Sequence, residues 1–278
     1  MVLGGGAVGL ELAQVYARFG VAVTVVEAMD RLLPVEEPES SALVEQALVA
    51  DGIAVRTGAR ATAVHHDGER FSVIVGDRVF SAEQLLVAVG RRAELAGLGV
   101  DAVGLDHTAP AIEVDEHMRA GDQLWAVGDV TGHGAFTHVA MYQAGIAIRD
   151  ILNEPGPPAD YRALPRVTFT DPEIGTVGLT EAEARAAGIP TEIGVAQVPH
   201  SARGWIHKTG NDGLIKLVAD TDRGVLVGAT SAGPTGGEAL SALAVAVHAR
   251  VPTDVLRHMI YAYPTFHRGI EDALRQLS

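Results

Sequence analysis

The sequence predicts a mixed α/β fold, in which a parallel sheet with crossover helices carries an antiparallel meander and precedes a separate α+β region. Three observations support this prediction. Residues 1–55 alternate between apolar strand patterns and helical patterns, as in a parallel sheet with right-handed crossovers. Short strand patterns separated by turn residues occupy residues 61–80, as in a meander. A proline-rich stretch at residues 153–158 blocks both helix and strand before the last set of patterns.

Strand and helix patterns follow one another through the first 152 residues. Apolar residues spaced by 4, 3 and 4 positions predict a helix that ends at Gly20; they are Val8, Leu12, Val15 and Phe19. The other expected elements are a strand at 1–3, a buried strand at 21–26, a helix at 40–50, a strand at 53–55, an antiparallel meander at 61–64, 70–75 and 78–80, strands at 85–89 and 124–127, and a helix at 137–152.

The α+β pattern begins after the proline-rich stretch. Thr180 and Glu183 form a capping-box pattern, which predicts a helix that Gly188 closes. The other expected elements are strands at 166–170, 176–178, 191–198, 214–219 and 225–230, and helices at 237–249, 253–258 and 266–276.

Length and composition restrict the class of protein. A length of 278 residues suggests about two domains. There are 35 acidic and 21 basic residues, a net charge of −14, so nucleic acid is not an expected partner, because phosphate contacts need clustered Lys and Arg. Neither a membrane-spanning stretch nor a signal peptide is found, which predicts a cytoplasmic protein without a membrane partner. With no cysteine, the chain itself carries no thiol chemistry.

The segment Gly4-Gly5-Gly6-Ala7-Val8-Gly9 fits the pattern G-x-G-x-x-G between a strand and a helix. The first glycine permits a tight turn, the second lets the backbone approach a pyrophosphate, and the third lets helix and strand pack closely. Glu27 closes the next strand, 18 residues after Gly9, where a carboxylate can accept hydrogen bonds from ribose hydroxyls and repel a 2′-phosphate. We therefore expect a Rossmann-like domain that binds NAD, although Arg31 leaves NADP open. The alternative is a glycine turn that serves packing alone.

Further motifs follow in order along the chain, and together they resemble a known family. They are Val25-Val26-Glu27, Val87-Ala88-Val89-Gly90-Arg91-Arg92, Trp125-Ala126-Val127-Gly128-Asp129-Val130, Phe169-Thr170-Asp171-Pro172-Glu173-Ile174, Val177-Gly178-Leu179-Thr180-Glu181, and Gly228-Ala229 through Gly233-Pro234. The sequence resembles the C-terminal part of the pyridine nucleotide–disulfide oxidoreductases, flavoproteins that include dihydrolipoamide dehydrogenase, glutathione reductase and mercuric reductase.

The resemblance implies roles for individual residues beyond the glycine turn and Glu27. It places Glu11 near the meeting point of nicotinamide and flavin, Ala61 at a backbone contact to adenine, and Gly90 beside the nicotinamide. Asp129 would accept hydrogen bonds from the ribityl chain of FAD. Thr137 would open a helix whose N-terminus points at the flavin. Without the resemblance, Asp129 is an ordinary turn residue.

The resemblance also implies a domain organisation and a partner. We expect an NAD-binding domain at residues 1–120, a remnant of the FAD domain with a linker at 121–158, and an α+β dimerisation domain at 159–278. The last of these would pair two subunits into a homodimer.

Two departures from the family pattern bear on function. The family's N-terminal half, with its FAD fingerprint and paired redox cysteines, has no counterpart here, so the chain would hold only a half-site for FAD. The family's C-terminal His-Pro-Thr-x-x-Glu is replaced by Tyr263-Pro264-Thr265-Phe266-His267-Arg268. A phenol, with an ordinary pKa near 10, does not relay protons at neutral pH as imidazole does, and arginine reverses the charge of the orienting acid.

These observations predict a truncated FAD-dependent NADH oxidoreductase that moves hydride from nicotinamide to flavin and whose acceptor is not a dithiol. They assign no catalytic residue and no metal site. One alternative is a catalytically silent fragment that binds NAD or only dimerises. Another is one half of a split enzyme, completed by a separate N-terminal FAD-binding polypeptide.

Overall fold

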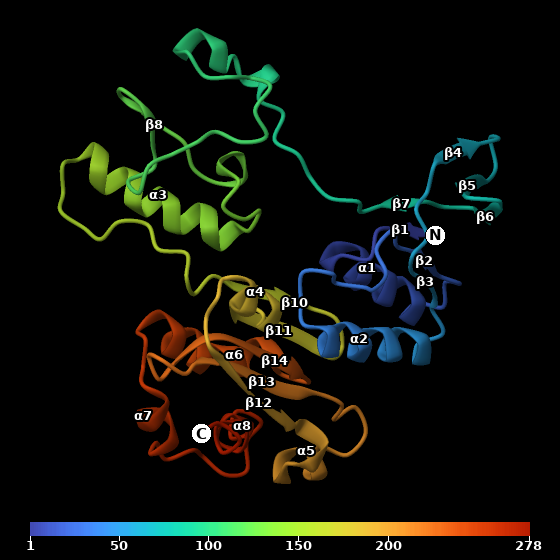
Figure 1. Cartoon of the computed structure of the whole chain (residues 1–278). Helices are drawn as coiled ribbons and strands as arrows, with labels where there is room; N and C mark the ends of the chain where they lie inside the picture. Colours follow the sequence, from blue (N-terminus) through green and yellow to red (C-terminus); the bar gives the residue numbers. More distant parts are fainter. The chain divides into compact units, whose positions relative to one another are not determined.

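The computed structural model describes all 278 residues and divides into two compact units. Unit 1 consists of residues 1–90 together with 162–278, and unit 2 of residues 91–161 (Figure 1). Unit 1 therefore joins the first predicted domain to the last one. The expected functional division into 1–120, 121–158 and 159–278 stays a prediction.

The N-terminal part of unit 1 is built on a four-stranded parallel sheet. Its strand order is β3-β2-β1-β7, from Ala54–Arg56, Thr24–Val26, Val2–Leu3 and Leu86–Val87. The helices α1 (Ala7–Arg18) and α2 (Pro38–Ala50) make the crossovers. Val2 pairs with Val25 on one side and with Leu86 on the other, and both pairings are parallel. The predicted β-α-β-α-β succession is confirmed in this sheet.

Two predicted strands are shorter than their apolar runs. The expected buried strand at 21–26 is paired only over β2, and Val21 is 53% exposed. The expected strand at 85–89 is paired only at Leu86–Val87, and Val89 is 66% exposed. The apolar runs predicted longer strands, but β1 has two residues and pairs with two residues on each of its neighbours, β2 and β7.

Helix α1 forms as predicted, but the apolar stripe that predicted it does not face the core. Val8, Val15 and Phe19 are exposed, at 59, 44 and 79% respectively. The buried face instead carries Gly9, Leu10, Ala13 and Gln14. Two faces of this helix have apolar residues at helical spacing, and the core contacts the face that carries Leu10 and Ala13.

A three-stranded antiparallel sheet, also predicted, follows β3. It consists of β4 (Ala63–His66), β5 (Phe71–Val75) and β6 (Arg78–Ala82), in that order. Gly76 has a φ of +55° in the tight turn between β5 and β6, a conformation that glycine adopts at little cost.

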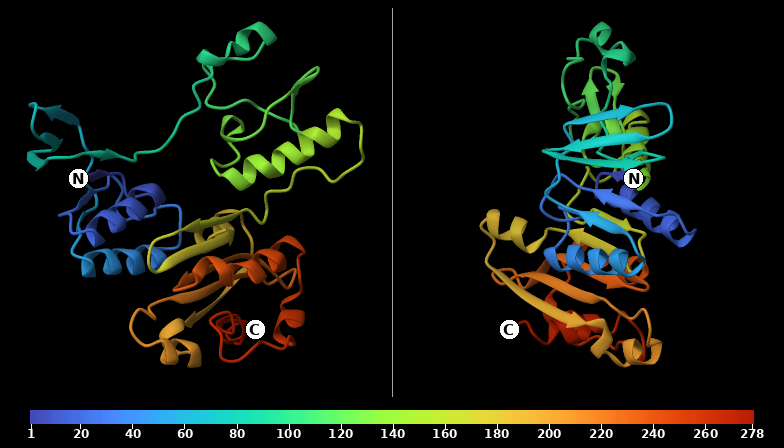
Figure 2. Two further views of the ribbon diagram at one scale, coloured as in Figure 1. Left: turned by 180° about the vertical axis from the view of Figure 1, so that it is seen from behind. Right: turned by 90° about the vertical axis from the view of Figure 1, so that its right-hand side faces the viewer.

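The C-terminal part of unit 1 is a five-stranded antiparallel sheet covered by helices (Figure 2). The strand order is β10-β11-β14-β13-β12, from Pro165–Thr168, Glu173–Gly178, Val225–Gly233, Leu214–Asp220 and Thr191–Gln197. The helices are α4 (Glu181–Ala186), α5 (Ala202–His207), α6 (Gly236–His248), α7 (Thr253–Arg257) and α8 (Gly269–Leu274), with a 3₁₀ turn at Val198–His200. The α+β prediction is confirmed, and α8 is shorter than the expected 266–276.

Packing in this region follows from small residues and a cap. Helix α6 lies across β11 and β14, and a Cβ on Gly175 would come within 2.9 Å of the carbonyl oxygen of Gly236, so the helix needs glycine there. The capping box at Thr180 and Glu183 is present, and Gly188 follows α4 with a φ of +73°. Both were predicted.

Unit 2 has little regular structure apart from one long helix. It contains α3 (Thr137–Ile151), a hairpin of β8 (Arg119–Gly121) and β9 (Leu124–Trp125), and 3₁₀ turns at Ala96–Leu98, Val100–Val103 and Asp129–Thr131. The predicted helix at 137–152 is confirmed. The predicted strand at 124–127 is paired only at Leu124–Trp125, in this antiparallel hairpin.

Candidate functional site

The glycine turn connects β1 to α1, and two of its glycines are required by close backbone contacts. Gly4 has a φ of +109°, and a Cβ on it would collide with the carbonyl oxygen of Ala88 on the neighbouring segment. A Cβ on Gly9 would collide with the carbonyl oxygen of Gly4. These positions therefore set the close approach of helix and sheet that the motif predicts.

Gly6 differs from these two glycines because it faces open space. It has an ordinary φ of −84°, and a Cβ on it would meet no atom within 4 Å. As the N-cap residue of α1 it provides no side chain to the free N–H groups of the first turn, and Ala7 and Val8 begin the helix. The turn thus leaves a positively polarised helix end uncapped beside an empty surface.

Glu27 lies at this turn, immediately after β2. Its side chain accepts hydrogen bonds from the backbone N–H of Gly5 and, at 2.6 Å, from that of Met29. The residue is only 8% exposed and forms no ion pair. Each carboxylate oxygen has two lone pairs, so the group keeps acceptor capacity for further donors.

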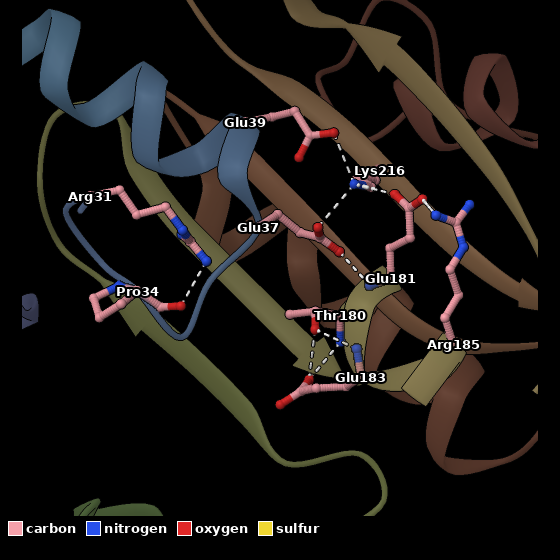
Figure 3. A network of polar contacts seen from close by, with 9 residues as sticks. All are labelled: Arg31, Pro34, Glu37, Glu39, Thr180, Glu181, Glu183, Arg185 and Lys216. Atoms are coloured by element: carbon pink, nitrogen blue, oxygen red, sulfur yellow. Dashed lines mark hydrogen bonds and ion pairs between the residues drawn. The ribbon is translucent and has the colours of Figure 1, made fainter. Parts of the chain in front are cut away.

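The side chain of Arg31 is held by backbone carbonyls. Its guanidinium donates to the carbonyl oxygen of Leu33 at 3.1 Å. It also donates to the carbonyl oxygen of Pro34, at 2.7 Å (Figure 3). Arg31 was the residue for which the sequence kept NADP as an alternative to NAD. Its guanidinium is bound to carbonyl oxygens of its own loop.

The loop after β3 lies beside Glu27. The backbone N–H of Ala59 donates to the carbonyl oxygen of Glu27 at 2.8 Å, and that of Gly58 donates to Met29 at 2.6 Å. Ala61, half-buried, follows in the same loop. Gly90 follows β7 with a φ of +111°. It is the last residue of the first of the two chain segments that form unit 1.

Glu11 and Gln14, on α1, contact the segment between β10 and β11. The carboxylate of Glu11 accepts from the backbone N–H of Phe169 at 2.8 Å. Gln14 accepts from the N–H of Asp171 at 2.8 Å and donates to its carbonyl at 2.9 Å. The glycine-turn helix is therefore attached to the C-terminal sheet. Sequence reasoning missed Gln14, because no local pattern marks a partner 157 residues away.

Asp129 and Thr137 belong to unit 2, whereas the glycine turn belongs to unit 1. Asp129, half-exposed, pairs with Arg91 at 3.1 Å, and Arg91 also donates to the carbonyl oxygen of Ala135. Thr137 is the first residue of α3, and no side chain caps this helix. The predicted flavin residues thus share one unit, where the carboxylate already has a cationic partner that the sequence did not reveal.

Gln143 fixes the turn that carries Asp129. This fully buried side chain accepts from the N–H of Gly128 at 2.6 Å and donates to Thr131 at 3.0 Å and to the hydroxyl of Tyr161 at 2.8 Å. Two of these hydrogen bonds bind α3 to the turn, and the third binds α3 to Tyr161. Sequence reasoning missed Gln143, because a polar residue in a helical pattern does not indicate a buried hydrogen-bonding role.

A buried ionic network joins α2 to the C-terminal sheet (Figure 3). The ammonium group of Lys216 on β13, 2% exposed, donates to Glu37 at 2.9 Å and to Glu39 and Glu181 at 2.8 Å each. Glu37 also accepts from the backbone N–H of Glu181 at 2.8 Å. Burial acts to lower the pKa of Lys216, but the three carboxylates outweigh it and raise that pKa above its usual value.

The loop after α7 carries the departure from the family signature. The guanidinium of Arg268 lies 5.5 Å from the ring centre of Tyr263 and pairs with Glu271 at 2.8 Å. Arg203 lies 5.3 Å from the ring centre of Phe266. Tyr263 is 69% exposed. The loop therefore carries the phenol of Tyr263 and the guanidinium of Arg268, and the guanidinium of Arg203, on α5, lies beside its Phe266.

No helix in the structure combines the length and apolar character needed to cross a membrane. No group of three or more acidic, histidine or cysteine side chains is arranged to hold a metal ion.

Comparison with known proteins identifies the family. The sequence profile described as pyridine nucleotide-disulphide oxidoreductase matches residues 1–144, and the profile of that family's dimerisation domain matches residues 164–274. The chain is 36% identical to a mercuric reductase from Streptomyces lividans, covering 98% of this chain and 58% of the relative. It is 33% identical to a dihydrolipoyl dehydrogenase from Corynebacterium glutamicum, covering 100% and 61%.

Solved structures agree with this match. LpdA from Mycobacterium tuberculosis superposes with a TM-score of 0.90 at 28% identity, covering 100% of this chain and 61% of that one. The HOCl-induced flavoprotein disulfide reductase RclA from Escherichia coli gives 0.88 at 26%, covering 100% and 64%. The chain thus spans about 60% of the length of these relatives. It belongs to the pyridine nucleotide-disulphide oxidoreductase family.

Proposed function

We propose that this chain forms the nicotinamide-nucleotide site and part of the flavin site of an FAD-dependent NADH oxidoreductase whose acceptor is not a dithiol. Its relatives include proteins named dihydrolipoyl dehydrogenase and mercuric reductase, which are oxidoreductases. The matches lend no support to a separate N-terminal polypeptide as partner.

The observation that carries this proposal is the open face of Gly6 beside the carboxylate of Glu27. The required glycines, Gly4 and Gly9, hold helix and sheet together, whereas Gly6 borders space that a side chain would enter. A dinucleotide fits this arrangement, because its pyrophosphate matches the uncapped helix end and its ribose matches the carboxylate.

This chain's residues would bind and orient the dinucleotide. The N–H groups of Ala7 and Val8 would donate to the pyrophosphate, and Gly5 and Met29 orient Glu27 to accept from the ribose hydroxyls. Because Glu27 is anionic and Arg31 is bound to carbonyls, a 2′-phosphate would be repelled and NAD favoured over NADP. The loop at Ala61 would border adenine. The bound nicotinamide and flavin would supply the hydride chemistry.

The flavin part of the proposal rests on Asp129 and Thr137. Asp129 retains a free oxygen, Oδ1, opposite its pair with Arg91, and it is half-exposed. Through that oxygen the carboxylate would accept from the ribityl chain, while the uncapped start of α3 would stabilise negative charge on the flavin. In the same scheme Glu11 and Gly90 would border the nicotinamide.

The acceptor class follows from the C-terminal loop. A dithiol acceptor needs a group that exchanges protons with thiols, and Tyr263, with Arg268 over its ring, replaces the family's histidine. We propose a homodimer through residues 164–274, in which this loop reaches the active site of the partner.

The test is NADH binding, followed by nicotinamide fluorescence, in Gly6→Ala. Because a Cβ at this position meets no protein atom, the variant should fold normally and yet bind NADH at least about tenfold more weakly, or about 1.4 kcal/mol. Gly97→Ala is the matched control, since its Cβ position is also open and lies in a different unit. Unchanged affinity in Gly6→Ala would overturn the proposal.

Flavin absorbance in the purified protein tests the FAD part. A colourless protein that binds NADH would reduce the proposal to dinucleotide binding.

A further inference from the structure

The five-stranded sheet of unit 1 has β12 as one of its end strands, and a side chain covers part of the outer edge of this strand. The carboxamide of Gln276 accepts from the backbone N–H of Val195 at 3.1 Å and donates to the carbonyl oxygen of the same residue at 2.6 Å. A carboxamide carries the donor and the acceptor that a neighbouring strand would present. Gln276 therefore takes the place of a further strand at this point of the edge.

The C-terminal segment, residues 276–278, is held in place by further hydrogen bonds. Ser278 donates to the carboxylate of Glu192 on β12, from its backbone N–H at 2.8 Å and from its hydroxyl at 2.6 Å. The guanidinium of Arg257 on α7 donates to the carbonyl oxygens of Leu277 and Ser278 at 2.7 Å each. The side chain of Leu277 is buried and belongs to the core cluster of this sheet. The segment is thus attached to β12, to α7 and to the core.

A glycine in β12 lets the preceding helix approach the strand closely. A Cβ on Gly194 would collide with the carbonyl oxygen of Ala273, near the end of α8. Because α8 contacts β12 at this point, the residues that follow the helix reach the edge of the strand, where Gln276 meets Val195.

The outer edge of β12 is complementary to itself. Val195 directs its N–H and C=O outward, and residues two positions apart in an antiparallel strand share that direction. Two copies of β12 paired antiparallel around Gly194 would use these outward groups. The facing residues would be Ile193 with Val195, Thr191 with Gln197, and Glu192 with Ala196. No like charges oppose one another in this register, so a second copy of the chain is a partner that the edge fits.

From these contacts we infer that the C-terminal segment is a cover that prevents β12 from pairing with β12 of a second copy. An uncovered edge strand is a template for pairing with another chain, and proteins block such edges. Gln276 occupies the outward groups of Val195, and Glu192 and Arg257 hold the segment there. The inference does not rest on the proposed function, because no dinucleotide contact enters it.

The first experiment measures hydrogen exchange of backbone amides by NMR in the full chain carrying Gln276→Ala. The N–H of Val195 loses its acceptor and should exchange at least about tenfold faster. The N–H of Leu217, on β13 between two strands, should exchange as slowly as in the parent. Gln197→Ala is the matched control, since it removes an exposed carboxamide from the same strand, and it should change neither rate. Unchanged exchange at Val195, or an equal increase at Leu217 or in the control, would overturn the inference.

The second experiment measures mass in solution by sedimentation over a series of protein concentrations. Gln276→Ala should form larger assemblies than the parent protein. Adding Ile193→Pro should reverse this, because proline removes an outward N–H that a second copy would use and keeps the bonds to β13. Slow exchange at Leu217 verifies that the sheet of the double variant is intact. Equal masses for Gln276→Ala and the parent, or assemblies that persist with Ile193→Pro, would show that the segment does not guard this edge.

Discussion

Glu27 and Glu37 are two buried carboxylates, 8% and 2% exposed, that the fold uses differently. Glu27 is held by two backbone N–H groups from residues near it and has no cation beside it. Glu37 is neutralised by Lys216 and accepts from the N–H of Glu181, both far along the chain. An acid held by amides next to an open turn can receive donors from a ligand, whereas an acid enclosed with a lysine holds two segments together.

The largest effect is expected at Lys216. Lys216→Met removes the cation and leaves three acids close together, of which Glu37 is fully buried, Glu181 is partly buried and Glu39 lies at the exposed edge. Removing one partner of a buried ionic group costs about 3–5 kcal/mol, because the remaining charges stay buried. We expect a loss of this size in the free energy of unfolding, measured by urea denaturation at neutral pH.

The matched control is Arg70→Met, which breaks the exposed pair with Glu83, where the side chains are 46% and 80% exposed. Exposed ion pairs contribute about 0–1 kcal/mol, so this variant should be nearly as stable as the parent. Similar losses in the two variants would contradict the distinction between a junction and a solvated pair.

The second prediction separates binding from stability. Glu27→Gln keeps the shape of the side chain but replaces one acceptor oxygen with a donor, so NADH affinity should fall about tenfold, or about 1.4 kcal/mol. The preference for NADH over NADPH should also decrease, because the negative charge that repels a 2′-phosphate is gone. Both affinities are measured by nicotinamide fluorescence.

Glu37→Gln is the counterpart. It weakens the contact with Lys216 and should lower the free energy of unfolding while leaving NADH affinity unchanged. A loss of NADH affinity in Glu37→Gln equal to that in Glu27→Gln would remove the contrast between the two carboxylates.

The contrast also explains what the sequence could predict. The glycine turn and Glu27 lie within 27 residues, and their constraints are local: a positive φ at Gly4, a close approach at Gly9 and a strand end. Such constraints leave a contiguous pattern. Lys216 and Glu37 are 179 residues apart, and Gln14 and Asp171 are 157 apart, so their contacts exist only after the two sheets have packed together.

At α1 the apolar periodicity predicted the helix but not the face that is buried. The spacing of its apolar residues correctly predicted a helix, but spacing cannot say which of two apolar faces the sheet will contact. Leu10 belongs to a core cluster that includes Ile174 and Leu214 from the C-terminal sheet, whereas Phe19 is 79% exposed. Which face of α1 is buried depends on contacts with residues far away in the sequence, and no short window of sequence contains them.

The smallest effect is expected at Glu39, the exposed edge of the Lys216 network, whose side chain is 42% exposed. Burial acts to raise the pKa of Glu39, but the hydrogen bond and charge of Lys216 outweigh it and hold that pKa below its usual value. The stabilisation is therefore present above the ordinary glutamate pKa of about 4.3 and is lost as pH falls through the lower pKa of the folded state. Solvent screening limits it to less than about 1 kcal/mol.

Glu39→Gln should therefore be slightly less stable than the parent at neutral pH, and the difference should close in acid. Urea denaturation of both chains over a series of pH values measures this. If the difference stayed constant well below the ordinary glutamate pKa, the stability change would not come from the ionised carboxylate. Glu39 would then act through packing, and the network would consist of Lys216 with the two more buried acids, Glu37 and Glu181.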